Sequence, residues 1–239
     1  MTTIISMWSG PRNISTTMMR SFANRADTAA IDEPFYGYYL ALSGADHPYR
    51  KETLDAYPSA FEAVIDRIGQ ARAKPVLFLK HIAYHLPDDA DLSFLAAHRN
   101  FLLIRDPRAM LASFADKFDD AAPIIRSFAI ARRIFEFLSA RGTAPPVVDA
   151  ADILSAPENM LRGLCGELGL RFDSAMLAWA PGPRPEDGPW AAHWYDAVRA
   201  STGFKPPVEK KLNLSRWLEE LADGAAADYR FLHNLRLRA

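Results

Sequence analysis

Residues 4–17 read Ile4-Ile5-Ser6-Met7-Trp8-Ser9-Gly10-Pro11-Arg12-Asn13-Ile14-Ser15-Thr16-Thr17, and this stretch decides the fold prediction for the chain. An apolar strand leads into a short turn, and a helix is expected to begin at about Ser15. Backbone N–H groups at a helix N-terminus point toward a bound anion, and the helix dipole strengthens the attraction. Arg12 adds a permanent charge whose planar fork fits tetrahedral oxyanions. The hydroxyl groups of Ser15, Thr16 and Thr17 can donate hydrogen bonds, so the stretch predicts a site for a phosphate-like anion.

The sequence lacks two features of sites that bind a nucleotide with a metal ion. The Walker A pattern G-x-x-x-x-G-K-[ST] is absent, so the lysine that contacts a Mg-nucleotide is missing. The six histidines are scattered, and no carboxylate pair has the spacing of a metal site. We therefore predict a site that uses no metal ion.

Length and composition narrow the class of protein. The chain has 239 residues, enough for one large α/β domain or a domain with a lid. Its formal net charge of −1 gives no basic field for nucleic acid or membrane binding. Cys165 is the only cysteine, which suits a reducing compartment. With no signal peptide and no bilayer-spanning apolar stretch visible, we expect a cytoplasmic protein.

Short apolar runs alternate with longer amphipathic runs along the chain. This pattern is typical of an α/β fold in which a mostly parallel sheet has helices on both faces. The runs at residues 76–79 and 101–104 are uniformly apolar, as expected for strands buried on both faces. Strands are predicted at residues 3–8, 28–31, 76–79, 101–104 and 146–149.

Capping residues mark several helices. Ser155 and Glu158 are predicted to form a capping box around Pro157, and Gly169 is predicted to end the helix that follows. Other helices are expected after Asp106-Pro107, over residues 121–141, and as one or two helices from about Asn213.

The stretch between Trp179 and Lys211 differs from the rest of the sequence. It contains six prolines together with Trp190, Trp194 and Tyr195. Long irregular segments in compact domains tend to be lids or binding loops, and these aromatic groups could stack on a base or ring. The alternative is a structural loop whose tryptophans pack against the core. We expect one domain over residues 1–239, with 179–211 as an aromatic-rich lid or loop and 212–239 as a helical segment.

Polar side chains are predicted to gather at one edge of the sheet. In an open parallel sheet, ligands bind beyond the carboxyl ends of the strands. Polar groups follow four predicted strands at these ends: the loop Arg12–Thr17, the pair Asp32-Glu33, the pair Lys80-His81 and the pair Arg105-Asp106.

Arg105 and Ser113 form a second candidate site for a phosphate. Arg105 stands at a strand end, and Ser113 lies two turns into the next predicted helix. The alternative is that Arg105 pairs with a nearby carboxylate and that Ser113 is a small helix-packing residue.

Glu33 is a candidate general base beside the anion loop. It precedes Pro34, which favours an extended backbone at Glu33. A carboxylate near a bound polyanion has its pKa raised, which suits proton abstraction near neutrality. Alternatively, Asp32 or Glu33 caps a helix that starts near Pro34.

Lys80 and His81 are predicted to end a buried strand. Lys80 could neutralise a leaving phosphate or a transferring group. His81 could be a base, and so could His85, although a structural histidine is the alternative for each.

These residues resemble motifs of the sulfotransferase family, whose members use 3′-phosphoadenosine-5′-phosphosulfate. The 5′-phosphosulfate motif P-R-S-G-[ST]-T stands here as Pro11–Thr16, and the 3′-phosphate motif corresponds to Arg105 and Ser113. The stretch 147–165 is similar to the family's segment after its last core strand. The resemblance covers about residues 1–180 and is greatest to a bacterial and plant subgroup with S-G-P-R and D-E-P motifs.

The resemblance implies a P-loop-like fold and assigns roles to single residues. Glu33 matches a glutamate that some members use as base, whereas Lys80-His81 lacks the middle residue of the K-T-H pattern that others use. We favour Glu33 as base and Lys80 as a group that stabilises the leaving group, with His81 as the weaker candidate. At Ile14 the family usually has glycine. The 5′-phosphosulfate would be held by Arg12, Asn13, Ser15, Thr16 and Thr17, and the 3′-phosphate by Arg105 and Ser113.

We therefore predict a sulfotransferase that acts on a hydroxyl or amine of a small-molecule acceptor. It would be a monomer or homodimer with no metal and no nucleic-acid or membrane partner. One alternative is a nucleotide-dependent small-molecule kinase, and another is a non-catalytic scaffold that binds an adenosine phosphate. The acceptor cleft could be lined by Trp8, Tyr36, Tyr38, Tyr39, Tyr84, Trp190 and Trp194.

Overall fold

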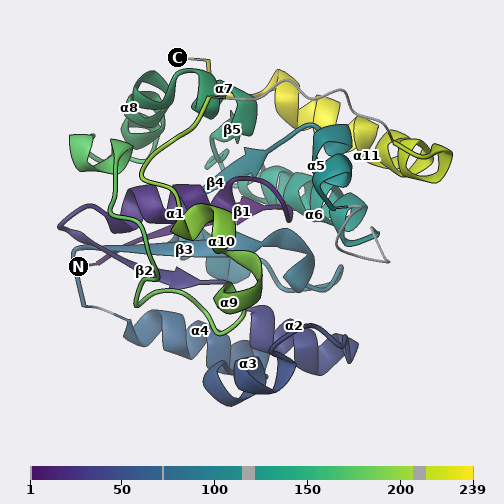
Figure 1. Ribbon diagram of the computed structural model, residues 1–239, viewed down its shortest axis with the longest axis horizontal. Coiled ribbons are helices and arrows are strands. Elements are labelled where there is room, and N and C mark those ends of the chain that lie inside the picture. Colours follow the sequence, from purple (N-terminus) through teal and green to yellow (C-terminus); the bar gives the residue numbers. More distant parts are fainter. Residues whose placement is uncertain (1, 72, 115–121, 207–213, 239) are drawn as a thin grey trace.

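Five parallel strands form the centre of the computed structural model, which describes residues 2–71, 73–114, 122–206 and 214–238. The strand order is β2-β3-β1-β4-β5, and Figure 1 shows how the labelled elements surround this sheet. The predicted α/β class and its strands are confirmed, with differences at the strand ends. The strands are β1 (Thr3–Ser9), β2 (Thr28–Asp32), β3 (Val76–Ile82), β4 (Arg99–Ile104) and β5 (Val147–Asp149).

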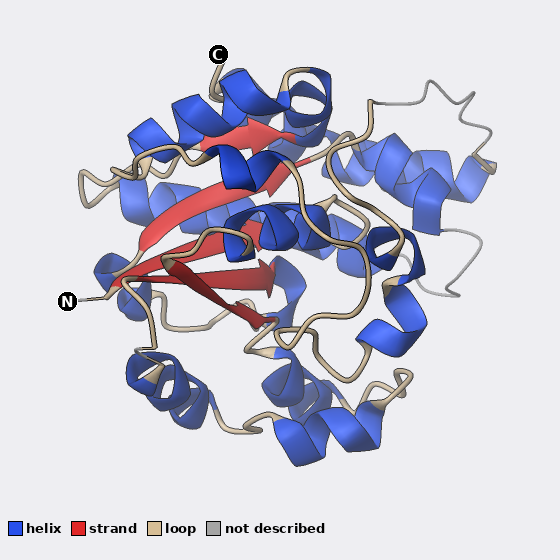
Figure 2. Ribbon diagram, turned by 60° about the vertical axis from the view of Figure 1, so that its left-hand side comes forward, coloured by secondary structure: helices blue, strands red, loops and turns tan. Residues whose placement is uncertain are grey.

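Helices cover both faces of the sheet, as Figure 2 shows for the strands drawn in red. One face carries Met7, Phe78 and Leu103, which pack with helices α1 (Ser15–Ala23) and α8 (Pro157–Glu167). The opposite face carries residues such as Leu77, Leu79 and Leu102, which pack with α4 (Phe61–Gln70) and α6 (Ala122–Ser139). Because side chains alternate along a strand, neighbouring residues of β3 belong to different faces.

The predicted cap at Asp106 is confirmed. Asp106 Oδ1 accepts from the backbone N–H groups of Arg108 and Ala109 at the start of α5 (Pro107–Phe114). The helix predicted from residue 121 is also present as α6, and no helix in the described ranges is long and apolar enough to cross a membrane.

The predicted capping box at Ser155 is wrong. Ser155 is the last residue of α7 (Ala150–Ser155), whose own cap is the Asp149 carboxylate. Because Ser155 still belongs to that helix, it does not take the N-cap position of α8, and Ala156 occupies that position without a side-chain hydrogen bond. Gly169 has a φ of +60° just after α8, so its predicted role in ending that helix is confirmed.

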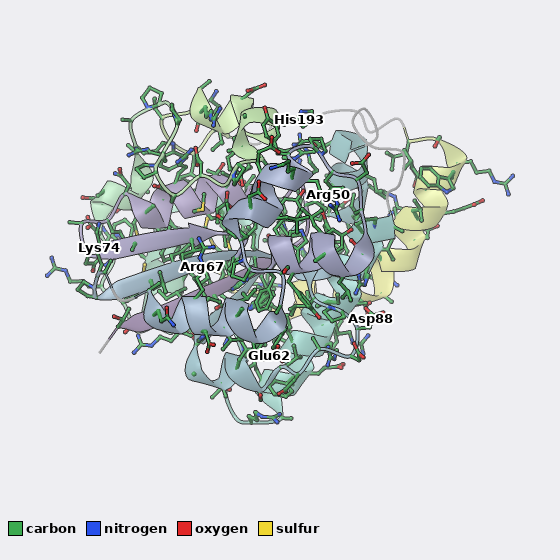
Figure 3. The ribbon with its side chains drawn as sticks, turned by 90° about the horizontal axis from the view of Figure 1, so that it is seen from below. Arg50, Glu62, Arg67, Lys74, Asp88 and His193 are labelled. Carbon is green, nitrogen blue, oxygen red and sulfur yellow. The ribbon has the colours of Figure 1, made fainter. Side chains whose placement is uncertain are left out.

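One helix, α11 (Arg216–Asn234), forms the C-terminal part, and it packs against α5 and α6 through residues such as Leu218 and Ala222. The predicted starting point, Asn213, lies outside the described residues. Three helices between β2 and β3 were not predicted beyond a start near Pro34. Figure 3 views the molecule from their side, with Arg50 on the second and Glu62 and Arg67 on the third. They are α2 (Tyr36–Ser43), α3 (Arg50–Ala56) and α4.

The segment 179–206 packs against the body of the protein. It holds two short helices, α9 (Ala191–Trp194) and α10 (Asp196–Arg199), while residues 207–211 of the predicted lid lie outside the described ranges. Trp190 and Tyr195 are buried in the same core cluster as Met7. For Trp190 and Tyr195, the alternative of a structural loop whose aromatic rings pack against the core is therefore the one observed.

An ion pair ties this segment to α1. Arg20 Nη2 lies 2.7 Å from Asp187 Oδ1, and Arg20 Nη1 lies 3.3 Å from Glu186 Oε1. The Arg20 side chain is 1 % exposed and that of Asp187 is 6 % exposed, so solvent does little to screen the pair.

Replacing Arg20 with methionine is expected to destabilise the protein by about 3 kcal/mol, because the buried Asp187 loses its close partner and keeps Arg199 Nε at 3.9 Å. For a chain of this length, the melting temperature would fall by about 6–12 °C. The matched control is Lys51→Met, which breaks an exposed pair with Asp55 and should leave the melting temperature close to that of the wild type. Equal shifts of the two variants in a thermal melt would contradict this view of the Arg20 pair.

Candidate active site

A cavity of about 660 Å³ opens where the strands end. Loops after β1, β2 and β4 line it together with the segment 179–206. All the site residues predicted from sequence line this cavity except His81. They are Arg12, Asn13, Ser15, Thr16, Thr17, Glu33, Lys80, Arg105 and Ser113.

The loop between β1 and α1 forms one wall. Helix α1 begins at Ser15 as predicted, and none of the described side chains caps its N-terminus. Its first backbone N–H groups are therefore available to an anion. Two loop residues have left-handed backbones, Arg12 with a φ of +58° and Ile14 with a φ of +31°. For a β-branched residue such as Ile14, this conformation costs about 1–2 kcal/mol.

Asn13 anchors the loop to the sheet. Its Nδ2 donates to the carbonyl of Leu103 in β4 at 2.6 Å, and the residue is buried. Its Oδ1 is also buried and has no hydrogen-bond partner among the described residues. This side chain therefore fixes the position of the loop.

Two arginines meet at the cavity wall. Arg105 Nη1 donates to the carbonyl of Arg12 at 2.7 Å, and Arg12 Nε donates to Ser113 Oγ at 3.1 Å. Neither guanidinium has a carboxylate within ion-pair distance in the described ranges, so the predicted alternative of a carboxylate partner for Arg105 is not seen. Burial lowers the pKa of both groups, and the charge of Arg12 lowers the pKa of Arg105 further. Asp149 and Asp106 act on Arg105 in the opposite direction, from beyond ion-pair distance. Two positive charges without an ion-pair partner in one cavity favour a polyanion.

A buried cluster of opposite charges lies at the ends of β2 and β3. Lys80 pairs with Asp32 in the strand register, and its Nζ donates to Asp32 Oδ1 at 2.7 Å. The same Nζ donates to Glu33 Oε1 at 2.6 Å and to the hydroxyl of Tyr195. Burial acts against the charge on Lys80, but Asp32 and Glu33 outweigh it and raise the pKa of Lys80.

Glu33 combines burial with access to the cavity. Burial raises its pKa, Lys80 lowers it and Asp32 raises it, with a net pKa of about 7. A carboxylate that is half ionised at neutral pH suits a general base.

The extended backbone predicted at Glu33 is wrong, since its φ is +41°. Its N–H donates to the carbonyl of Lys80 at 2.8 Å and its carbonyl accepts from Tyr36 N, so the chain turns here toward α2. Among the described residues, no side chain caps α2, so the capping alternative for Asp32 and Glu33 does not apply.

His81 lies on the opposite face of the sheet from Lys80. Strand β3 continues to Ile82, so the prediction that both residues follow the strand is wrong. The imidazole of His81 stacks on Trp8 with ring centroids 4.0 Å apart, and burial lowers its pKa well below the usual value. His85 also lies outside the cavity lining, stacked on Tyr36, with its Nδ1 3.9 Å from Glu33 Oε2.

The aromatic side chains predicted to line an acceptor cleft divide into two groups. Tyr36, Tyr84, Trp190 and Trp194 line the cavity. The prediction is wrong for Trp8, Tyr38 and Tyr39, which pack against rings elsewhere in the core. Other lining residues were not predicted for this cleft, among them the aromatic side chains of His47, Tyr195 and Tyr229.

Comparison with known proteins identifies the family of this chain. A protein family described as "Sulfotransferase domain" matches residues 2–234. Two curated relatives come from Arabidopsis thaliana, the branched-chain-amino-acid aminotransferase-like proteins 1 and 2. They are 38 % and 37 % identical over 205 residues, which are 85 % of this chain. The chain spans only 37 % and 36 % of the length of these relatives.

Three solved structures have a similar fold. The sulfotransferase domain of an olefin synthase from Synechococcus PCC 7002 gives a TM-score of 0.55 at 18 % identity, covering 94 % of both chains. A sulfotransferase domain from the curacin biosynthetic pathway gives 0.57 at 14 % identity, covering 95 % of this chain and 98 % of that one. A sulfotransferase from Alicyclobacillus acidocaldarius gives 0.56 at 10 % identity, covering 98 % and 96 %. At these identities the likeness establishes the fold.

Proposed function

Because this chain belongs to the sulfotransferase family, we propose that it transfers a sulfuryl group from 3′-phosphoadenosine-5′-phosphosulfate to a small-molecule acceptor. The observation that carries the choice of donor is the pair Arg12 and Arg105, two cavity arginines without a carboxylate partner among the described residues. A donor with two phosphate groups supplies the negative charge that this pair lacks.

The donor would lie across the loop and the start of α5. Backbone N–H groups at the start of α1, with the hydroxyls of Ser15, Thr16 and Thr17, would bind the 5′-phosphosulfate. Arg105 and Ser113 would bind the 3′-phosphate. Arg12 would interact with both ends, since its Nε already contacts Ser113 Oγ.

The acceptor would bind beside Glu33, where aromatic rings such as Tyr36 and Trp194 line the cavity. Glu33 would take the proton from the acceptor hydroxyl or amine as its oxygen or nitrogen bonds to sulfur. The bound donor supplies the sulfuryl group, its bond from sulfur to the bridging oxygen breaks, and adenosine 3′,5′-bisphosphate remains. Arg12 and the backbone N–H groups would stabilise the charge on that oxygen.

Lys80 would contribute mainly through its charge. All three protons of its ammonium group are used by Asp32, Glu33 and Tyr195, so a contact with the leaving oxygen requires the loss of one partner. We assign His81 a packing role because it lies on the other face of the sheet.

A thermal-shift titration with adenosine 3′,5′-bisphosphate tests this proposal. At a hundredfold excess over its dissociation constant, the ligand should stabilise the protein by about 2.7 kcal/mol, with no need for Mg²⁺. Adenosine 5′-monophosphate is the control ligand that lacks the 3′-phosphate and should give a smaller shift. A shift with Mg-ATP alone would indicate a nucleotide-dependent kinase. Binding of the bisphosphate without sulfuryl transfer to a panel of phenols, alcohols and amines would favour a non-catalytic scaffold.

A further inference from the structure

The hydroxyl group of Tyr195 lies at the centre of a buried hydrogen-bond network. It donates to Asp32 Oδ2 at 2.7 Å and accepts from Lys80 Nζ and from Trp190 Nε1, the latter at 3.1 Å. A phenolic hydroxyl has one proton and two lone pairs, so these partners use its full capacity. Tyr195 is 5 % exposed, and it lies 115 positions from Lys80 in the sequence.

The segment that carries Tyr195 is fixed on both sides of this hydroxyl. Trp190 is buried between other rings, with centroids 4.7 Å from Tyr36 and 5.1 Å from Tyr57. The backbone N–H of Gly188 donates to Asp32 Oδ2 at 3.3 Å. Together with the ion pair of Arg20, these contacts keep the hydroxyl in place.

The network treats the two carboxylates differently. Asp32 accepts from three donors, which are Lys80 Nζ, Tyr195 Oη and Gly188 N. Glu33 Oε1 accepts from Lys80 Nζ, and the Tyr195 hydroxyl also acts on Glu33 directly and lowers its pKa. Hydrogen bonds to a carboxylate favour its charged form, so the few donors at the buried Glu33 carboxylate leave its pKa raised.

We propose that Tyr195 is a positioning residue for sulfuryl transfer, which acts on Glu33 directly and through Asp32 and Lys80 to fix the Glu33 carboxylate at the cavity wall. This inference rests on the proposed function for its consequence in turnover, but the network itself is a property of the free protein. Without the hydroxyl, Glu33 loses the direct interaction with Tyr195 that lowers its pKa. Asp32 also loses a donor, so its negative charge acts more strongly on Glu33. Both changes raise the proton affinity of Glu33.

Other groups around Glu33 belong to the same environment and stay unchanged in the test. The titratable and charged side chains that act on or face Glu33 are Asp32 on β2, Lys80 on β3, Tyr36 on α2, Tyr57 after α3, Tyr84 and His85 after β3, and Tyr195 between α9 and α10. Burial lowers the pKa of His85 well below its usual value, so this ring is neutral in the range where Glu33 titrates.

The test is a titration of Glu33 by infrared difference spectroscopy, with Glu33→Gln as the subtraction reference. In Tyr195→Phe, the midpoint of the Glu33 carboxyl band is expected to move upward by about one pH unit. The matched control is Tyr57→Phe, because the Tyr57 ring packs on the same Trp190 and its hydroxyl has no hydrogen bond within the described part of the chain. The control midpoint should equal that of the wild type.

Turnover gives a second reading. Tyr195→Phe is expected to lower kcat about tenfold and to leave the KM for the donor unchanged, with the acid limb of the rate profile displaced in step with the infrared midpoint. A wild-type midpoint in Tyr195→Phe would overturn the positioning role even if the protein transfers sulfuryl groups. Conversely, the midpoint could be displaced in a protein that shows no transfer activity. That result would support the positioning role of Tyr195 and contradict the proposed function.

A further variant covers the case in which Tyr195→Phe does not fold. Asp32→Asn keeps the ring packing and removes the negative charge through which Tyr195 acts. Its Glu33 midpoint should fall by about one pH unit or more, because a like charge has been removed. An unchanged midpoint would show that Asp32, and with it the hydrogen bond from Tyr195 to Asp32, does not affect the pKa of Glu33.

Discussion

Replacing Glu33 with glutamine is expected to lower kcat by about 10²–10⁴-fold, the usual contribution of a general base. The amide oxygen can still accept from Lys80, so the side chain should keep its place. The affinity for adenosine 3′,5′-bisphosphate should stay close to that of the wild type, since the anion loop is untouched. Steady-state kinetics with a binding titration measure both quantities.

The pH dependence separates a base from a merely structural carboxylate. With a pKa of about 7 for Glu33, kcat/KM of the wild type should fall about tenfold per pH unit below pH 7, and glutamine should remove this limb. The control is Glu62→Gln on the exposed face of α4, which should match the wild type. Wild-type turnover in Glu33→Gln would show that another group takes the proton.

The same shift has a consequence for stability. The pKa of Glu33 in the folded protein lies above its unfolded value of 4.5, so the folded state holds the proton more tightly between the two. The contribution of Glu33 to stability is therefore full below about pH 4.5 and is lost as the pH rises through about 7. The melting temperature of the wild type minus that of Glu33→Gln should therefore decrease as the pH is raised from 5 to 8.

Replacing Arg105 with alanine is expected to weaken binding of adenosine 3′,5′-bisphosphate by about 10²-fold. The loss combines a charge-assisted contact to the 3′-phosphate with the support that Arg105 gives to the Arg12 carbonyl. Adenosine 5′-monophosphate, which lacks the 3′-phosphate, should lose less affinity. Isothermal titration with the two ligands measures the difference.

Two further variants sharpen this comparison. Arg105→Lys keeps the charge but loses the planar fork, so its affinity should lie between those of the wild type and Arg105→Ala. Arg108→Ala is the matched control, because Arg108 lies outside the cavity lining and pairs with Glu219 and Asp223 on α11. Equal losses in the Arg105 and Arg108 variants would place the 3′-phosphate elsewhere.

Local patterns were sufficient to predict the five strands and the loop between β1 and α1. Uniform apolar runs marked β3 and β4, and the cap at Asp106 marked the start of α5. The same period of two could have separated Lys80 from His81, since adjacent strand residues face opposite sides of a sheet. The polar side chains of Lys80 and His81 suggested that the strand had ended. Strand β3 continues to Ile82 because Lys80 is paired with Asp32 of β2 and its charge is balanced there.

Contacts between distant segments could not be predicted in this way. Tyr195 stood out as one ring in an aromatic stretch, but its partners lie 115 and 163 positions away in Lys80 and Asp32. Arg20 gave no signal on its helix, because its partners belong to a segment with no regular pattern. At Ser155, the capping pattern matched the sequence, but the preceding helix α7 already included that residue.

The left-handed backbone at Ile14 links heat resistance to ligand recognition. Glycine adopts this conformation at little steric cost, and asparagine tolerates it better than a β-branched residue. Laboratory evolution under heat alone would therefore tend to replace Ile14, although its side chain also lines the cavity and packs on the core. Position 14 is thus one at which selection for durability and selection for turnover can favour different residues.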